Sequence, residues 1–128
     1  MERRPQAIEV HDLSTGQHVN RMAKVAALLA SHLGLDAERV QLLRLAAPMH
    51  DVGKIATPNE ILRKPGPLTP QEREEMERHT TVGHEILADS ESPLFRPAAL
   101  IALTHHESLD CSGYPSGLAG EQIPLESR

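Results

Sequence analysis

Aromatic side chains are almost absent from this sequence. Its 128 residues include one tyrosine, Tyr114, one phenylalanine, Phe95, and no tryptophan. Because aromatic side chains supply much of the buried area in many proteins, a core here must be built from Leu, Ile, Val, Ala and Met. The hydrophobic fraction of 39% is still enough for one domain with a core. It also argues against an intrinsically disordered chain.

Three further absences narrow the class of protein. A single cysteine, Cys111, excludes an internal disulfide and fits a reducing cytosol. No apolar run approaches the roughly 20 residues that cross a bilayer, and no signal peptide is visible. The net charge of −5, without a basic stripe, argues against binding to a nucleic-acid polymer. We therefore expect a cytoplasmic protein that binds neither a membrane nor a nucleic-acid polymer.

The first half of the chain has the apolar spacing of helices. A helix is predicted from Gln17 to Leu33, with an inward stripe at Val19, Met22, Val25 or Ala26, Leu29 and Leu33. Gly34 supplies its C-terminal stop. Asp36 is the expected N-cap of a second helix that runs towards His50. Pro48 is predicted to bend the last turn of that helix and to direct the following side chains into a cleft.

The second half is predicted to contain two more long helices. Prolines make residues 54–68 a connector with one short helical turn at 59–62. Thr69-Pro70-Gln71-Glu72 is a capping box that starts a helix running on to Leu87. Another helix begins at Ser92-Pro93 and ends at His105-His106-Glu107, before a structured loop at 108–128. Residues 1–15 are predicted to be a leader or upstream linker. Without alternating strands or repeats, the fold class is all-α.

Histidine is the unusual residue, with eight copies. The adjacent pair His50-Asp51 offers a metal ion one nitrogen and one oxygen ligand, and the second carboxylate oxygen can bridge to another ion. His105-His106 can converge on one centre because the helix ends there. Glu107 is then expected to accept a hydrogen bond that fixes an imidazole tautomer. The alternative for this pair is an exposed polar helix terminus.

The other histidines are harder to assign from the residues alone. His18 and His79 lie on apolar helix faces, where a lone histidine is more often a core residue than a ligand. Gly83, one turn beyond His79, leaves room for close approach of another element, at a cost of about 1 kcal/mol relative to alanine. His11, in the leader, His32, near a helix end, and His84, five residues from His79, are predicted not to be ligands.

A ligand set of imidazoles and carboxylates without thiolates suits iron or manganese better than structural zinc. Two such ions about 3.5–4 Å apart can clamp a phosphoryl group during in-line displacement. Lys54, three residues after Asp51, offers a cation for a phosphate oxygen. The alternative for Lys54 is an ordinary surface lysine.

The order of these features resembles the HD-GYP family, the branch of the HD phosphohydrolase superfamily that hydrolyses the bacterial second messenger cyclic di-GMP. The matching segments are HVNRM (18–22), APMHDVGKI (47–55), ILRKPGPLTPQE (61–72), RHTTVGHEIL (78–87) and HHESLDCSGYPSGLAGEQIPLESR (105–128). HD alone is a weak signal, but HD followed at this spacing by HHE, GYP and IPL is highly specific. The resemblance covers nearly all of the chain from Gly16 onward.

The resemblance implies roles for the matching residues and a cofactor of two divalent ions, iron or manganese. Asp51 would bridge the ions, with His50 and His18 on the first and His79, His105 and His106 on the second. Lys54 would contact the scissile phosphate, so Asp51 and Lys54 are the expected catalytic residues. Gly113-Tyr114-Pro115 would border the substrate and form the family's proposed contact surface for GGDEF-domain partners. Tyr114 would stack on guanine or donate to phosphate; the alternative is a loop anchor packed over the core.

Three departures from the family pattern bear on these expectations. Cys111 stands where the family usually has glycine, so we expect a slightly different loop path. Ser14 stands where some members have an acidic residue that supports a third metal, which favours two ions. The family continues beyond the equivalent of Arg128 into helices that carry another aspartate ligand. We therefore expect residues 16–128 to be an HD-type helical bundle without its C-terminal helices, and uncovered apolar surface then favours a homodimer.

The predicted function is metal-dependent hydrolysis of cyclic di-GMP to a linear dinucleotide or GMP. One alternative is an HD phosphohydrolase acting on another nucleotide. The other is a catalytically silent module that binds GGDEF-type partners through the loop.

Overall fold

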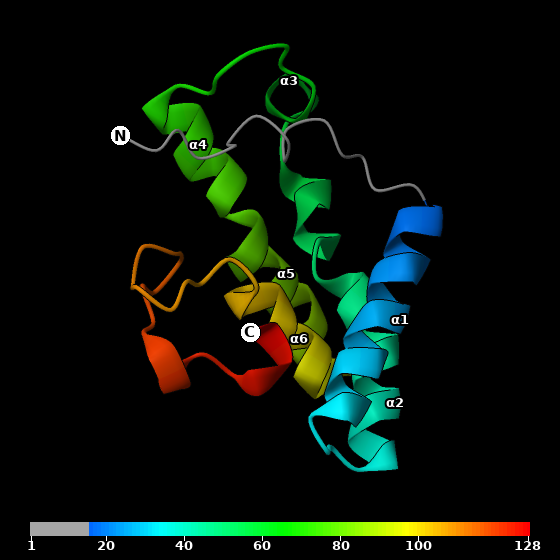
Figure 1. Ribbon diagram of the computed structural model, residues 1–128. Helices are drawn as coiled ribbons and strands as arrows, with labels where there is room; N and C mark the ends of the chain where they lie inside the picture. Colours follow the sequence, from blue (N-terminus) through cyan, green and yellow to red (C-terminus); the bar gives the residue numbers. More distant parts are fainter. Residues whose placement is uncertain (1–15) are drawn as a thin grey trace.

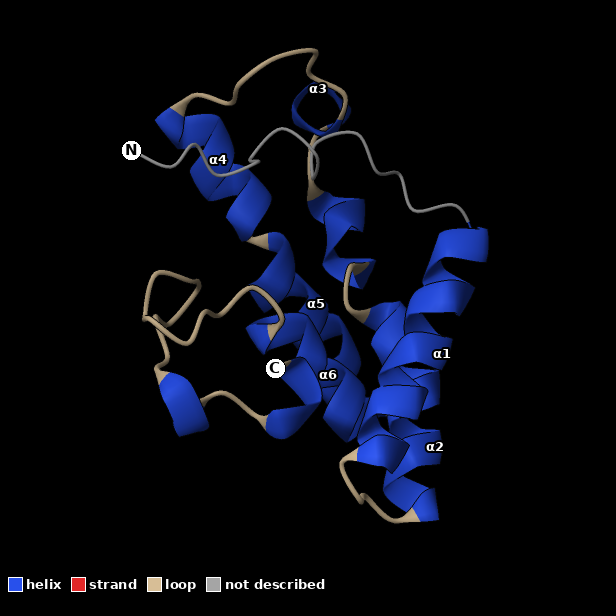
Figure 2. Cartoon of the chain, viewed as in Figure 1, coloured by secondary structure: helices blue, strands red, loops and turns tan. Residues whose placement is uncertain are grey.

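The structure, a computed structural model, describes residues 16–128. The predicted leader at 1–15, together with His11 and Ser14, lies outside these residues. The described part contains only helices and loops, apart from an isolated bridge between Asp110 and Ala119 (Figure 2). The all-α prediction is thus confirmed for this part of the chain. Its elements are α1 (Gly16–His32), α2 (Ala37–Ala46), η2 (Ala47–Met49), η3 (Val52–Ala56), α3 (Asn59–Leu62), α4 (Pro70–Glu77), α5 (His79–Ala88), α6 (Phe95–Thr104), η4 (Gly120–Gln122) and η5 (Leu125–Ser127).

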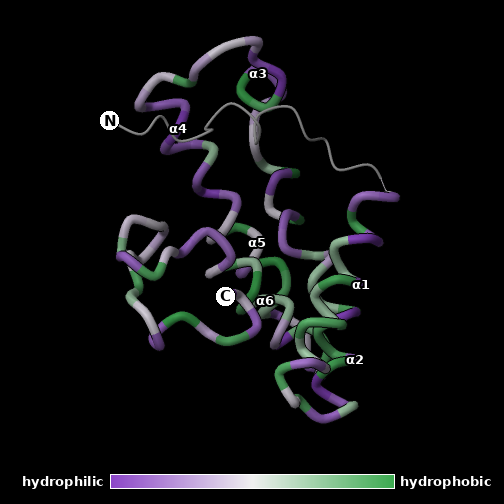
Figure 3. Tube along the Cα trace, in the orientation of Figure 1, coloured by the Kyte–Doolittle hydropathy of each residue, from purple (hydrophilic) through white to green (hydrophobic). Residues whose placement is uncertain are grey.

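Helices α5 and α6 pack against each other at the centre of the molecule (Figure 1). Helix α2 packs on α6 and on α1. The short helix η5, close to the C-terminus, also packs on α6. The core is aliphatic, as predicted, and rich in alanine. Its buried members are Ala30, Leu43, Ala46, Ala47, Leu87, Ala98, Ala99, Ile101 and Ala102. Hydrophobic residues accordingly run along α1, α2, α5 and α6, whereas α4 is mostly hydrophilic (Figure 3). Between residues 16 and 128, no helix combines the length and apolarity needed to cross a membrane.

The predicted inward stripe of α1 is right in part. Met22 and Ala26 pack against the core, but Leu29 and Leu33 are 60% and 67% exposed. The fully buried residues of α1 are Ala23, Ala27 and Ala30. Helix α1 packs on α2 and η2, and alanine side chains allow two helix backbones to approach closely. Several bulkier apolar side chains, such as Leu28 and Leu29, therefore lie on the outer side of the helix, which periodicity alone does not distinguish from the inner side.

The predicted caps at Asp36 and Thr69 are confirmed, whereas the helix predicted to begin at Ser92-Pro93 begins at Phe95. The Asp36 carboxylate caps α2 by accepting a hydrogen bond from the Arg39 backbone N–H at 2.9 Å. Thr69 and Glu72 form the capping box of α4, with each side chain accepting from the other residue's backbone N–H. These caps are read correctly because all their atoms lie within one turn of the chain.

Two predicted helices end earlier than expected. Helix α2 stops at Ala46, and the chain tightens into η2, which contains Pro48. The long helix predicted from Thr69 to Leu87 is divided at Arg78 into α4 and α5. The ψ angle of Arg78 is −17°, so the backbone departs there from regular α-helix geometry. The division makes His79 the first residue of α5.

Two glycines bring η3 against the start of α5. A Cβ on Gly53 would lie 1.9 Å from the carbonyl oxygen of His79, and one on Gly83 would lie 3.2 Å from the Ala102 Cβ. Backbone therefore meets backbone at this crossing, which a larger residue at position 53 would prevent. The prediction that Gly83 accommodates another element is confirmed, and Gly53 in η3 is the residue it meets.

Candidate metal centre

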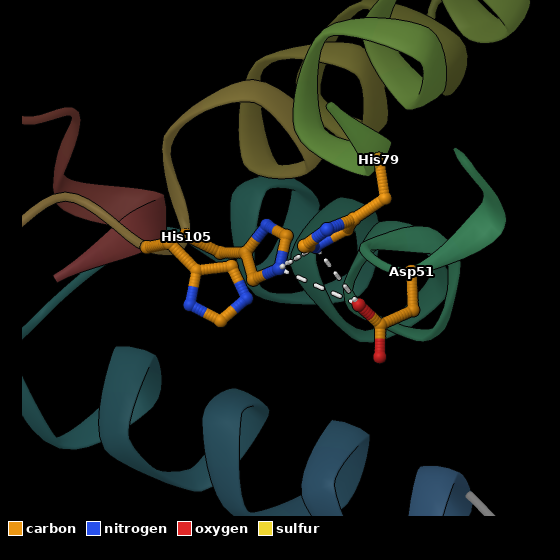
Figure 4. A group of neighbouring side chains, drawn as sticks. Asp51, His79 and His105 are labelled. Carbon is orange, nitrogen blue, oxygen red and sulfur yellow. Dashed lines mark hydrogen bonds and ion pairs between the residues drawn. The ribbon is translucent and has the colours of Figure 1, made fainter. Parts of the chain in front are cut away.

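Three chain segments bring Asp51, His79 and His105 together (Figure 4). Asp51 follows the tight turn of η2, which contains Pro48, and directly precedes η3. His79 begins α5, and His105 caps the C-terminus of α6. The packing of η3 and α6 on α5 therefore sets the distances between the three side chains.

One oxygen of Asp51 faces two imidazoles. Its Oδ1 lies 3.4 Å from the Nε2 of His79 and 3.6 Å from the Nε2 of His105, and these two nitrogens are 3.4 Å apart. Oδ1 is buried and has no hydrogen-bond donor. With His106, these residues form a group whose ligand atoms all lie within 4.8 Å of one another. The group supplies three nitrogens and one oxygen.

The backbone selects the imidazole tautomers. His79 Nδ1 lies 2.7 Å from the Met76 carbonyl oxygen, and His105 Nδ1 lies 3.0 Å from the Ile101 carbonyl oxygen. Since a carbonyl can only accept, both Nδ1 atoms carry the hydrogen. The Nε2 lone pairs of the neutral rings then point at each other and at Asp51 Oδ1, with no hydrogen among the three atoms. A divalent cation fits this arrangement because it would satisfy all three acceptors at once.

The second oxygen of Asp51 faces a different set of groups. Its Oδ2 lies 2.8 Å from the Lys54 ammonium and 3.2 Å from the Nε2 of His50. The Nδ1 of His50 donates to the Ala47 carbonyl oxygen at 2.9 Å, so its ring is also oriented by the backbone. The carboxylate thus has one oxygen towards His79 and His105 and the other towards His50 and Lys54.

The site favours the protonation states of metal ligands. Burial and the nearby charges of His105 and His79 lower the pKa of His106 to about 3. Burial likewise lowers the pKa of His79. Burial of Asp51 works towards a higher pKa, but the interactions with His105, His50 and Lys54 outweigh it and hold the pKa far below its usual range. At neutral pH, Asp51 is therefore ionised and His79 and His106 are neutral.

His50 differs from these two histidines. Its burial works to lower the pKa, but the hydrogen bond and charge of Asp51 prevail and the pKa is raised. The remaining predicted ligand, His18, is an exposed residue in the first turn of α1 and does not belong to the four-residue group. Its ligand role stays a prediction. The predicted non-ligands His32 and His84 are also outside the group.

The loop after His106 lies against the cluster. The Tyr114 ring stacks on the His106 ring, with centroids 4.7 Å apart and planes 16° from parallel. The substrate-contact and loop-anchor roles predicted for Tyr114 both stay predictions. The bond from Tyr114 to Pro115 is cis. Cys111 has a φ of +64°, the left-handed conformation that glycine adopts readily. Cysteine therefore takes a glycine-like backbone conformation here.

The role predicted for Glu107 is wrong. Its carboxylate does not bond directly to an imidazole, because its two oxygens accept hydrogen bonds from the backbone N–H groups of Ser116 and Leu118, each at 2.8 Å. The sequence interpretation also missed Gly53, whose close contact with α5 is not a property of any local pattern. Its position between the HD pair and Lys54 was the only available signal.

Comparison with known proteins places these features in context. The sequence model of the HD domain family matches residues 5–128. The chain is 49% identical, over its whole length and 34% of the relative's, to the cyclic di-GMP phosphodiesterase response regulator RpfG of Xanthomonas campestris pv. campestris. It is 46% identical, over 91% of its length and 32% of the relative's, to a cyclic di-GMP phosphodiesterase of Thermotoga maritima.

A third relative is named for a different cyclic dinucleotide. The chain is 44% identical, over 95% of its length and 23% of the relative's, to the 3'3'-cGAMP-specific phosphodiesterase 2 of Vibrio cholerae. The chain thus spans about a third or less of the length of these curated relatives.

Proposed function

Because the chain belongs to the HD domain family, we propose that it is a metal-dependent phosphodiesterase domain acting on cyclic di-GMP. The product is a linear dinucleotide or GMP, and the reaction serves second-messenger signalling in a bacterial cytoplasm. The observation that carries this assignment is the buried Asp51 Oδ1, which faces two imidazole lone pairs without a hydrogen-bond donor. Similarity to named cyclic di-GMP phosphodiesterases supports the choice of substrate.

The residues divide into two groups around the bridging carboxylate. Asp51 Oδ1, His79, His105 and His106 would hold one divalent ion. Asp51 Oδ2 and His50, which lie 3.2 Å apart, would hold the second, and His18 would join them. Iron or manganese fits a donor set of imidazoles and carboxylate without thiolate. When bound, such ions polarise the phosphoryl oxygens and offset the negative charge that develops in the transition state.

The protein's own groups prepare the substrate for this chemistry. Lys54, now 2.8 Å from Asp51 Oδ2, lies within reach of a phosphate that approaches the cluster and donates to one of its oxygens. The low pKa values of His79 and His106 leave these rings neutral, so they do not repel a cation at physiological pH. The loop with Gly113, Tyr114 and Pro115 borders the substrate and is the contact surface for GGDEF-domain partners.

A matched pair of variants tests this function. Protein loaded with Mn²⁺ or Fe²⁺ is incubated with cyclic di-GMP, and the products are separated by anion-exchange chromatography. Wild type is expected to release the linear dinucleotide or GMP. Asp51→Asn removes the bridging charge at unchanged size and is expected to slow turnover by about 100-fold or more. Asp89→Asn makes the same change at an exposed residue at the end of α5 and is expected to match wild type.

The same assay separates the alternatives. A substrate panel that contains both cyclic di-GMP and 3'3'-cGAMP shows which one the protein hydrolyses. Faster hydrolysis of 3'3'-cGAMP would indicate the specificity for which the Vibrio cholerae relative is named. If metal-loaded wild type hydrolyses none of the panel, the enzymatic proposal is wrong. If the folded protein also fails to take up metal, a silent module that binds GGDEF-type partners is the better description. Sedimentation analysis tests the homodimer, which remains part of the proposal.

A further inference from the structure

Glu107 is a buried charged residue that the proposed mechanism leaves unused. Its side chain is close to fully buried, with a residue exposure of 9%. It directly follows His105 and His106, yet its carboxylate points away from the metal cluster and into the following loop. Both oxygens accept backbone hydrogen bonds at 2.8 Å, from Ser116 and from Leu118. Bonds to an ionised acceptor are among the stronger ones in proteins.

The segment that receives these bonds is a closed loop, residues 109–120, which we name the GYP loop. Its ends meet at the bridge between Asp110 and Ala119, and the Gly120 N–H donates to the Leu109 carbonyl oxygen at 3.2 Å. Glu107 bonds to the returning half of this loop, near its closure. The carboxylate therefore ties the loop to the C-terminal end of α6, where the two histidines are.

The outgoing half of the GYP loop contacts the histidine segment directly. A Cβ on Gly113 would lie 2.4 Å from the His106 carbonyl oxygen and 2.4 Å from the Ser108 nitrogen, so the two backbones are in contact there. The Tyr114 N–H donates to the same His106 carbonyl at 3.2 Å. Side chain and backbone of Tyr114 thus both meet His106, since the phenol ring stacks on the imidazole.

His106 is the ligand candidate that the GYP loop contacts directly. Its ring packs edge-on against His79, with centroids 5.1 Å apart, and lies 4.2 Å from the His105 ring. His79 and His105 are oriented by hydrogen bonds from Nδ1 to carbonyls of their own helices. For His106, the Tyr114 ring covers the face of the imidazole, so rotation of one ring requires movement of the other.

The geometry points to Glu107 as a positioning residue for the metal centre, acting through the GYP loop and the Tyr114 ring to orient His106. This inference rests on the proposed metal role of His106 and not on the identity of the substrate. Because coupling between two sites is reciprocal, metal bound at His106 also stabilises the docked GYP loop. Residues that orient a ligand without touching the metal typically change metal affinity by about 10–100-fold when altered.

The composition of the chain offers a direct readout. Tyr114 is its sole tyrosine and there is no tryptophan, so intrinsic fluorescence reports on the GYP loop alone. Mn²⁺ is paramagnetic and quenches a fluorophore that is stacked on one of its ligands. Binding of Mn²⁺ is also measured independently from the EPR signal of the free aqueous ion, which is lost on binding.

The test compares Glu107→Gln with Glu121→Gln at a temperature where circular dichroism shows all proteins folded. Glutamine at 107 keeps one acceptor but turns an N–H₂ group towards the other backbone donor. Glu107→Gln is expected to weaken Mn²⁺ binding by about 10-fold or more and to increase acrylamide quenching of Tyr114 in the metal-free protein. Glu121→Gln removes the same charge at an exposed position next to the loop and is expected to match wild type.

A second variant separates positioning from folding. Tyr114→Leu leaves the Glu107 hydrogen bonds in place but removes the stacked ring, and it is expected to weaken Mn²⁺ binding in the EPR titration as well. If Glu107→Gln and Tyr114→Leu lower thermal stability but bind Mn²⁺ as tightly as wild type, Glu107 has a structural role only and the inference is wrong. If wild type itself binds no Mn²⁺, both the metal centre and this inference fail. Absence of cyclic di-GMP hydrolysis with intact Mn²⁺ binding contradicts the proposed function alone.

Discussion

At the scale of single residues, the two carboxylate oxygens of Asp51 have different neighbours. One of its oxygens faces imidazole lone pairs and the other faces Lys54 and His50. The ammonium group of Lys54 offsets the carboxylate charge in the metal-free protein, and in the proposed mechanism it contacts phosphate. Substitution of Asp51 should therefore lower both metal binding and turnover, because Asp51 is a proposed ligand. Substitution of Lys54 should lower turnover only.

Lys54→Gln is expected to reduce kcat for cyclic di-GMP by about 100-fold, a typical loss when one donor to a developing oxyanion is removed. Metal content should stay unchanged because the ligand set is intact. Initial rates and elemental analysis of the purified protein measure both quantities, and the exposed Lys24→Gln is the control. A loss of bound metal in Lys54→Gln would mean that Lys54 supports the centre and not the substrate.

The lowered pKa values of His106 and His79 should make the stability of the metal-free protein depend on pH. The pKa of His106 is about 3 when folded and near 6.5 when unfolded, and that of His79 is also lowered. Between these values the unfolded chain binds more protons, so the free energy of unfolding falls as the pH is lowered from 6.5 to 4.5. His50, whose pKa is raised, loses its stabilising effect only above this window. Asp51 titrates below it in both states.

Urea denaturation at pH 6.5, 5.5 and 4.5 measures this slope. Each group contributes at most about 1.4 kcal/mol per pH unit. His106→Asn is expected to flatten the dependence, whereas the exposed His32→Asn should leave it as in wild type. A wild-type stability that does not change across the window would contradict the low pKa values.

At the scale of elements, the contact between η3 and α5 positions the site. Gly53→Ala places a Cβ 1.9 Å from the His79 carbonyl oxygen, so η3 must move away from α5. We expect a loss of about 3 kcal/mol or more in stability, together with weaker metal binding because Asp51 and His79 separate. Gly66→Ala, where a Cβ meets nothing within 4 Å, is the control. Urea denaturation and Mn²⁺ titration of both variants should show that Gly53→Ala loses stability and Mn²⁺ affinity and that Gly66→Ala keeps both.

The elements also show where sequence interpretation succeeds and fails. The caps at Asp36 and Thr69 were predicted correctly because each is completed within three residues. The division at Arg78 was not, because no proline or glycine signals it and α4 and α5 pack on different neighbours. The inward stripe of α1 was only partly right because an apolar pattern does not separate small residues from large ones, and Ala23 is buried whereas Leu29 is exposed.

At the scale of the whole molecule, metal and fold are linked. The four residues of the candidate centre come from the η2–η3 turn, the start of α5 and the end of α6. A metal bound there connects segments that are far apart in the sequence, and it binds the folded state only. Stability should therefore rise with metal concentration.

Thermal unfolding with and without Mn²⁺ measures this linkage. At a free Mn²⁺ concentration 100 times the Kd, the expected gain is about 2.7 kcal/mol, and EDTA should remove it. Asp51→Asn should abolish the gain, whereas Asp89→Asn should preserve it. A midpoint that does not respond to Mn²⁺, Fe²⁺ or chelator in wild type would contradict a metal centre.

The sequence by itself determined the helical class, the helix caps and the ligand chemistry, because these depend on residue types and on spacings of a few residues. It also indicated His50, Asp51, His79, His105 and His106 as a set, through the order of motifs that resembles a known family. Only the tertiary structure decided which Asp51 oxygen faces which group, that Gly53 meets the His79 backbone, and that Glu107 holds the GYP loop. These features arise from contacts between segments distant in the chain. Which atoms touch in such contacts depends on how the helices pack, and local sequence patterns do not determine that packing.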